Sequence, residues 1–291
     1  MKKILLVSGC SFSDPIFESV LHPEMNCDWP KWPELVAEEL NMQCVNLSTS
    51  GSGNEKIYSV ISDYLTTPID KELSFTSKRH IIDKNFKFPM PQKKSDIGLV
   101  VAAWSQAHRR DWSMRNTLSD KSKKDWRLNF RNKKDWWTNM LTDDKGDIYY
   151  WFLKSVRYQY AYQNLCKQLD LPYVQFQMIS NWRAWVQEII ESWNDSKKEE
   201  ERKNRKFWRE IKSNLLKHLD DTGYRQLINK KFLGWPGDIK TDNYYGKTSW
   251  KLSDCLSQEE RLSDIDCHPN KQGHEKLAEE FLKHLHENKI L

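Results

Sequence analysis

Two short segments at opposite ends of the sequence carry the residue types of a hydrolytic site. Ser11 lies in Gly-Cys-Ser-Phe-Ser at 9–13, directly after an apolar run, and His268 lies in Asp-Cys-His-Pro-Asn at 266–270. A serine hydroxyl becomes a nucleophile when an imidazole accepts its proton, and a carboxylate holds that imidazole in the correct tautomer. Ser11, His268 and Asp266 are therefore the candidate nucleophile, base and orienting acid.

These residues also have structural interpretations. Ser11 could simply cap a following helix, and a histidine in a loop is usually solvated. Asp264 is a second candidate for the orienting carboxylate, whereas His274 is expected on the face of a C-terminal helix. Gly9 permits a tight turn before Ser11, and a helix beginning after that turn would point N–H groups at an oxyanion.

The loop Ser-Thr-Ser-Gly-Ser-Gly-Asn at 48–54 offers further hydrogen-bond donors. Gly51 lets the backbone approach a ligand closely, so its N–H is a candidate oxyanion donor, although the Gly-Ser-Gly run could be only a turn. Asn54 could donate through its side-chain amide or cap the helix that follows. Both residues are therefore candidates for binding the substrate.

Apolar runs alternate with amphipathic segments along most of the chain. The pattern predicts strands at 2–7, 43–47, 96–103, 173–178 and 231–234, and helices at 32–40, 57–65, 149–169 and 270–288. Continuous apolar runs are typical of strands buried on both faces of a parallel sheet. The expected fold class is α/β, with three α/β/α layers and a mainly parallel, flavodoxin-like sheet of about five strands.

The strand ends predict where a site would form. Ser11, Gly51 and Ser105 each fall just past a predicted strand. Because the carboxyl ends of parallel strands share one edge of the sheet, these separate segments are expected to meet there.

Two stretches depart from this alternation, and we expect one domain over 1–291 with insertions at about 105–148 and 183–230. The first is rich in Lys, Arg, Asp and Trp with little periodicity. The second is strongly helical over 183–219 and contains a charge run at 197–206, typical of a solvated helix face. Residues 66–93 are expected to form a loop or excursion.

The composition bounds the function. The chain has 291 residues, of which 38% are hydrophobic and 30% charged, and its net charge of +5 does not by itself favour a nucleic-acid partner. No stretch is apolar enough for a membrane span, and the run after Met1 is too short for a signal peptide, which favours a cytoplasmic location. The six cysteines lack paired spacing, so we expect reduced thiols and no metal site.

The 14 tryptophans are unusual for a chain of this length. They could anchor irregular insertions onto the core, or form a platform on which sugar rings or bases stack. Those in polar surroundings are Trp29, Trp32, Trp112, Trp126, Trp136, Trp137, Trp182, Trp185 and Trp193.

The segments resemble the conserved blocks of the SGNH (GDSL-type) hydrolase family. Residues 9–13 resemble its first block, with Cys10 in the place of the usual Asp, and 46–51 resemble the block that carries the oxyanion glycine. Residues 266–270, followed by Gly273, resemble the last block. The Gly-Cys-Ser-Phe form of the first block, together with Trp-Ser after the third strand, resembles a divergent branch of the family that is found in bacterial and phage genomes. If the protein is encoded by a phage, a virion-associated location is expected instead of a cytoplasmic one.

Two departures from the family pattern bear on the chemistry. The family usually has Gly-x-Asn-Asp after the third strand, where 103–106 reads Ala-Trp-Ser-Gln, so that Ser105 or Gln106 could donate instead, or the oxyanion hole is weakened. Loss of one such donor typically costs about 100- to 1000-fold in rate. The family usually places Asp three residues before His, where this chain has Ile265, and Asp266 lies two residues before.

The resemblance implies a serine esterase or acyl hydrolase that needs no metal or cofactor. Ser11 would attack an ester carbonyl after proton transfer to His268, and the N–H groups of Gly51 and Ser11 would hold the oxyanion. The substrate suggested by the aromatic and basic side chains of the first insertion is an O-acetylated or acidic carbohydrate. Those side chains are Arg109, Arg110, Trp112, Trp126, Trp136 and Trp137.

Other functions remain open. The missing third-block asparagine and the Trp-rich basic insertion would also suit a degenerate scaffold that binds carbohydrate, or less favourably nucleic acid. An acyltransferase, in which a sugar hydroxyl replaces water, has the same residues. No membrane partner is expected, and the sequence leaves the oligomeric state open.

Overall fold

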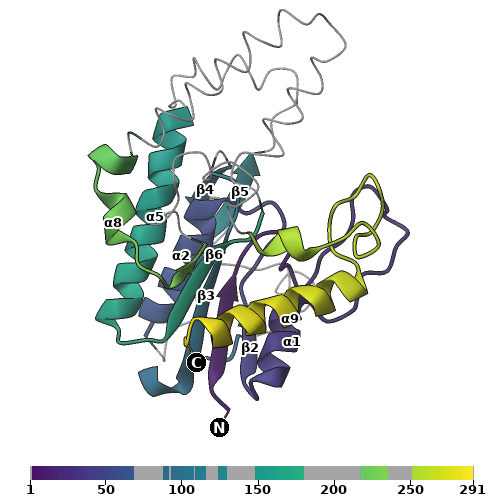
Figure 1. Cartoon of the computed structure of the whole chain (residues 1–291), viewed down its shortest axis with the longest axis horizontal. Coiled ribbons are helices and arrows are strands. Elements are labelled where there is room, and N and C mark those ends of the chain that lie inside the picture. The colour runs from purple at the N-terminus through teal and green to yellow at the C-terminus, as the bar shows by residue number, and fades with distance from the viewer. Residues whose placement is uncertain are drawn as a thin grey trace, which may run out of the picture.

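A five-stranded parallel sheet forms the centre of the molecule (Figure 1). Its strands are β2 (Gln43–Asn46), β1 (Ile4–Ser8), β3 (Ile97–Trp104), β6 (Tyr173–Gln177) and β7 (Phe232–Leu233), in this spatial order. This is the flavodoxin-like order of doubly wound sheets. The computed structural model describes residues 2–68, 88–91, 93–107, 109–115, 124–129, 148–179, 217, 219–234 and 251–290.

The central strands β1 and β3 are almost entirely apolar, as expected for strands that are covered on both faces. Every residue of β1 and β3 is buried. Successive side chains of a strand point to opposite faces, so that Ile4 and Leu6 join one hydrophobic cluster while Leu5 and Val7 join the other. The continuous apolar runs of the sequence are thereby explained.

Helices pack on each face and complete three layers. On one face lie α2 (Asn54–Thr66), α5 (Ile148–Gln168) and the short α8 (Tyr224–Leu227). On the other lie α1 (Trp32–Glu39) and α9 (Lys271–Glu287), where the rings of Trp32 and Phe281 meet at 5.2 Å. Two 3₁₀ turns, η1 (Lys94–Asp96) and η3 (Leu252–Cys255), lead into β3 and precede the last loop. The predicted α/β/α fold class is confirmed.

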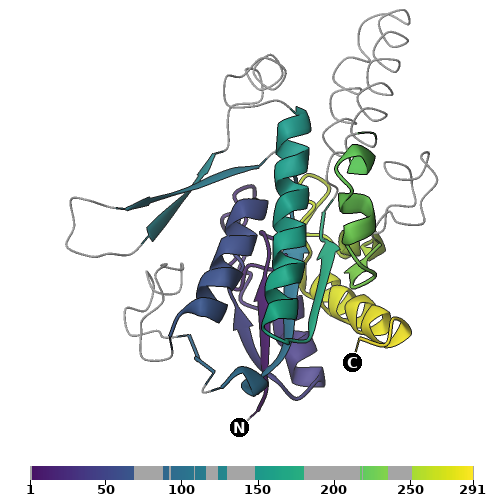
Figure 2. The same cartoon turned by 90° about the vertical axis from the view of Figure 1, so that its left-hand side faces the viewer.

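The stretch 105–148 differs from the prediction. It contains an antiparallel hairpin of β4 (Arg110–Arg115) and β5 (Lys124–Asn129), which projects from the body of the sheet (Figure 2). Each strand has only two apolar residues in alternation, which is too short a pattern to distinguish from irregular chain. The predicted excursion at 66–93 and helical insertion at 183–230 lie mostly outside the described residues. No helix in the described part is long and apolar enough to cross a membrane.

Candidate active site

Ser11 lies in a tight turn at the carboxyl end of β1. The N–H of Ser13 donates to the carbonyl of Cys10 at 2.9 Å. The amide of Asn46 donates to the Ser13 carbonyl at 2.8 Å, and the indole N–H of Trp32 donates to its hydroxyl at 2.9 Å. The turn is therefore fixed from β2 and α1. The helix considered after this turn does not form, because the next helix along the chain is α1.

His268 lies in a loop that is braced at both ends. The N–H of Leu262 donates to the His268 carbonyl at 2.9 Å, and the N–H of Asn270 donates to the Glu260 carbonyl at 3.0 Å. Asn270 also caps α9, since its side chain accepts a hydrogen bond from the N–H of Gly273. A Cβ atom at Gly273 would lie 2.1 Å from the Glu260 oxygen, so only glycine fits this close approach.

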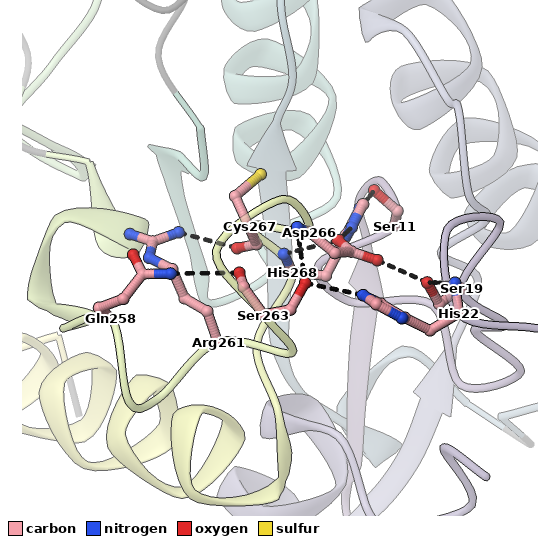
Figure 3. A network of polar contacts seen from close by, with 9 residues as sticks. All are labelled: Ser11, Ser19, His22, Gln258, Arg261, Ser263, Asp266, Cys267 and His268. Carbon is pink, nitrogen blue, oxygen red and sulfur yellow. Dashed lines mark hydrogen bonds and ion pairs between the residues drawn. The ribbon is translucent and has the colours of Figure 1, made fainter. Parts of the chain in front are cut away.

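The two segments bring the predicted residues into one chain of hydrogen bonds (Figure 3). His268 Nε2 lies 2.7 Å from the hydroxyl oxygen of Ser11, and its Nδ1 lies 2.5 Å from Oδ1 of Asp266. The backbone N–H of His268 donates to the same Oδ1 at 3.1 Å. This is the geometry in which an imidazole can accept a proton from a serine while a carboxylate stabilises the resulting imidazolium.

Asp264, the alternative carboxylate, lies apart from this chain. It is exposed, and its Oδ1 accepts a hydrogen bond from Gln258 at 2.9 Å. His274 lies on the buried face of α9, where Nδ1 accepts a hydrogen bond from the N–H of Trp32 at 3.2 Å. Burial lowers the pKa of His274 to about 3, so it stays neutral and structural.

Burial and hydrogen bonding shift the pKa values of His268 and Asp266. The rings of Phe12 and Phe17 lie 5.0 and 4.5 Å from that of His268. Burial lowers the pKa of His268 below its usual value, although the hydrogen bond and the charge of Asp266 oppose this. Burial would raise the pKa of Asp266, but hydrogen bonds from Ser19 and His268 outweigh it and hold that pKa below its usual range. Near neutral pH, the site thus holds a neutral imidazole beside a carboxylate.

These shifts predict the pH dependence of any reaction in which His268 acts as the base. The neutral form of His268 is the active one, and its lowered pKa keeps it neutral at pH values where an ordinary histidine is half protonated. The acid limb of kcat/KM is therefore expected below pH 6.5, the usual histidine value. A pH–rate profile of the wild-type protein checks this, and a limb above that value would contradict it.

The loop after β2 is fastened to the turn of Ser11. The N–H and hydroxyl of Ser50 donate to Oδ2 of Asp14 at 2.7 and 2.6 Å, and the N–H of Thr49 donates to the Gly9 carbonyl at 3.3 Å. Gly51 follows with φ of 81°, a conformation that favours glycine. Among the described residues, neither the N–H of Ser11 nor that of Gly51 donates a hydrogen bond. Both remain available to a ligand.

The other candidate donors lie between α2 and the end of β3. Oδ1 of Asn54 accepts a hydrogen bond from the N–H of Ser105 at 2.8 Å. The side-chain nitrogen of Asn54 and the hydroxyl of Ser105 are both buried, without a partner in the described part of the chain. Gln106 instead accepts a hydrogen bond from Nε of Arg109 at 3.2 Å. Asn54 thus has a fixed carbonyl oxygen and an unpaired amide nitrogen.

Sequence reasoning missed two carboxylate contacts that shape the site. The hydroxyl of Ser19 donates to Oδ2 of Asp266 at 2.6 Å, across 247 positions in sequence. Asp111 of β4 accepts from the N–H groups of Gly53 at 3.0 Å and Lys56 at 2.9 Å, and so caps α2. Burial raises the pKa of Asp111 to about 6. No local pattern signals either contact, because the partners are distant in sequence.

No family model and no curated protein matches the sequence. Among solved structures, an acetyl xylan esterase (Est2A) from the rumen bacterium Butyrivibrio proteoclasticus is similar with a TM-score of 0.41 and 11% identity. The similarity covers 98% of this chain and 64% of that one, so this chain spans just under two thirds of that esterase. Within the described ranges, no cluster of His, Cys, Asp or Glu could hold a metal ion.

Proposed function

We propose that this protein is a serine esterase of the SGNH type, with Ser11 as nucleophile, His268 as base and Asp266 as orienting acid. The observation that carries the proposal is the chain of hydrogen bonds of 2.7 and 2.5 Å that joins these three residues at the carboxyl edge of the sheet. In acyl transfer, a buried carboxylate on the far side of the imidazole holds the tautomer that can accept the serine proton, and Asp266 is placed in this way.

The proposed reaction proceeds in two stages, acylation of Ser11 and hydrolysis of the acyl-enzyme. Ser11 Oγ attacks the ester carbonyl carbon as its proton passes to His268 Nε2, and Asp266 stabilises the imidazolium. The oxyanion that forms accepts hydrogen bonds from the free N–H groups of Ser11 and Gly51. As the C–O bond breaks, His268 returns the proton to the leaving alcohol. Water then gives a proton to His268 and attacks the acyl carbon. The bond from that carbon to Ser11 Oγ breaks as His268 returns the proton to Ser11, which releases the acid and restores the free serine.

Asn54 is proposed as the third oxyanion donor, in place of the asparagine missing after β3. Its Oδ1 is held by the N–H of Ser105, which leaves the buried amide nitrogen without a partner. An unsatisfied buried donor costs about 1–3 kcal/mol, so an oxyanion that accepts from it would remove that cost. Ser105 then supports Asn54, and its own hydroxyl remains a second candidate.

Asn54→Asp separates the two proposed roles of this side chain, which are to accept a hydrogen bond from Ser105 and to donate one to the oxyanion. The carboxylate can still accept the hydrogen bond from Ser105, but it cannot donate to an oxyanion. We expect kcat to fall by about 100- to 1000-fold, with a similar fall in Asn54→Ala, which introduces no charge. Steady-state kinetics and thermal melts of both variants check this. A near wild-type kcat in folded Asn54→Asp would contradict the donor role.

The proposed substrate is an O-acylated, in particular O-acetylated, carbohydrate. Arg109 supports an acidic sugar, because within the described ranges its half-buried guanidinium donates to neutral acceptors alone, Gln106 Oε1 and the Ser52 carbonyl, each at 3.2 Å. Its charge also lowers the pKa of His268, which places it within electrostatic reach of the base. The tryptophan side chains of the first insertion, and the side chain of Arg110, lie outside the described residues.

A substrate screen tests the function. Release of acid is measured from nitrophenyl esters of increasing acyl length and from neutral and uronic-acid oligosaccharides that carry O-acetyl groups. Hydrolysis of short-chain esters, fastest for the acetylated acidic sugar, is expected. Absence of hydrolysis across the screen, from a folded protein, would contradict the esterase proposal.

One alternative, a carbohydrate-binding module on the same scaffold, is favoured by the absence of the usual asparagine after β3. The same acetylated oligosaccharides test this alternative by calorimetry, since a binding module retains its affinity when Ser11 is replaced by alanine. An acyltransferase would be revealed by transfer of the acyl group to an added sugar acceptor.

A further inference from the structure

The segment 14–31, between the Ser11 turn and α1, has no helix or strand but is held firmly at both ends. Asp14 accepts a hydrogen bond from the N–H of Ile16 at 3.0 Å, besides those from Ser50. At the other end, the buried Lys31 donates to the carbonyl of Trp29 at 3.0 Å and to that of Cys27. This segment therefore presents its side chains to the site in a defined position.

Ser19 makes the closest polar contact between this segment and the candidate triad. It is 3% exposed, and its hydroxyl donates to Oδ2 of Asp266 at 2.6 Å, the carboxylate oxygen that does not face His268 (Figure 3). The N–H of His22 donates to the same hydroxyl at 2.9 Å. Because the hydroxyl oxygen accepts from His22, its proton is directed at Asp266.

We propose that Ser19 is a positioning residue that completes the candidate triad by fixing the free oxygen of Asp266. This inference rests on the proposed function. His268 occupies Oδ1 through both its ring and its backbone N–H, so Ser19 is the partner that holds Oδ2 among the described residues. Without it, a buried carboxylate oxygen would be left unsatisfied and the carboxylate could rotate.

A second pair of contacts fastens the same two segments. His22 Nε2 lies 2.7 Å from the hydroxyl of Ser263, which accepts a hydrogen bond from the N–H of Asp266 at 3.1 Å. Phe17 adds the ring contact with His268 at 4.5 Å. Ser263 thus holds the backbone of Asp266, whereas Ser19 holds its carboxylate. This difference supplies a matched control.

The charge of Asp266 is shared between its two donors. A hydrogen bond from Ser19 withdraws part of the negative charge that would otherwise act on His268. Removing the hydroxyl should strengthen the attraction between Asp266 and a protonated His268, and so raise the pKa of the imidazole. A role confined to packing of the segment would not move this pKa.

The test is an NMR titration of the His268 side chain in the full-length protein, made without substrate. Ser19→Ala is expected to raise the pKa of His268 relative to the wild type and to lower kcat about 10-fold with KM little changed, the scale of one hydrogen bond to a charged group. Ser19→Thr should restore both values. Ser19→Cys, similar in size but a weak donor, should lie between and provides a second variant if alanine prevents folding.

Ser263→Ala is the control, expected to lower thermal stability while leaving the His268 titration unchanged. An unchanged titration in Ser19→Ala, or an equal shift in Ser263→Ala, would overturn the inference. Because the titration needs no turnover, it is independent of the esterase proposal. If the wild-type protein does not hydrolyse esters, the proposed function is overturned. A shift of the His268 pKa in Ser19→Ala would then still support the role of Ser19 in fixing Asp266.

Discussion

Ser11→Ala is expected to lower kcat for ester hydrolysis by about 10⁴- to 10⁶-fold, with the fold unchanged. The hydroxyl of Ser11 is the nucleophile of the proposed reaction, and alanine leaves His268 without a proton to accept. The hydrogen bond to His268 that is lost is partly buried, so a small loss of thermal stability is expected beside the loss of rate. The measurement is the steady-state rate with a short-chain nitrophenyl ester, followed beside a thermal melt.

Ser257→Ala is the matched control for this variant, because Ser257 is an exposed serine whose hydroxyl donates only to Glu259. It should keep the wild-type rate. If Ser11→Ala also kept that rate, the hydrolysis would arise elsewhere in the protein, and the assignment of Ser11 as nucleophile would be wrong.

Asp266→Asn should reduce kcat by about 10⁴-fold, although the asparagine side chain has nearly the same size and shape as the aspartate it replaces. An asparagine at this position can accept from Ser19 with its oxygen and then turns its NH₂ group toward Nδ1 of His268. Nδ1 must then accept a hydrogen bond, so the ring proton moves to Nε2. That nitrogen can no longer take the proton of Ser11, and the base is lost without removal of any side chain.

Asp264→Asn provides the comparison for this effect. Asp264 lies two residues earlier, is exposed and contacts Gln258, so its amide should leave kcat unchanged. Steady-state rates of the two variants at the same pH decide between the carboxylates. A loss in Asp264→Asn with activity kept in Asp266→Asn would reverse the assignment.

The sequence predicted the sheet well because burial on both faces leaves a clear signal. In the runs at 4–8 and 97–104, every residue except Ser8 and Gly98 belongs to one of the two hydrophobic core clusters. The hairpin of β4 and β5 was not predicted, since each strand carries only a short alternation of apolar and polar residues. Local pattern thus reveals buried strands better than projecting ones.

The candidate site was predictable in part for a similar reason. Ser11 and His268 lie in compact motifs beside strand and helix ends, so their meeting at one edge of the sheet follows from topology. The contact of Ser19 with Asp266 and that of Asn54 with Ser105 depend on how loops pack across 247 and 51 positions. A serine or asparagine in a polar loop gives no sign of such a partner.

The most direct test of the proposed active site is labelling with a fluorophosphonate probe, which reacts with a serine only when its hydroxyl is activated. The wild-type protein should be labelled at Ser11, as located by mass spectrometry of the digested protein. Ser11→Ala and His268→Ala should not be labelled, whereas replacement of the exposed His286 by alanine should leave labelling intact. No labelling of a folded wild-type protein, or labelling that persists in Ser11→Ala, would contradict an activated serine at this site.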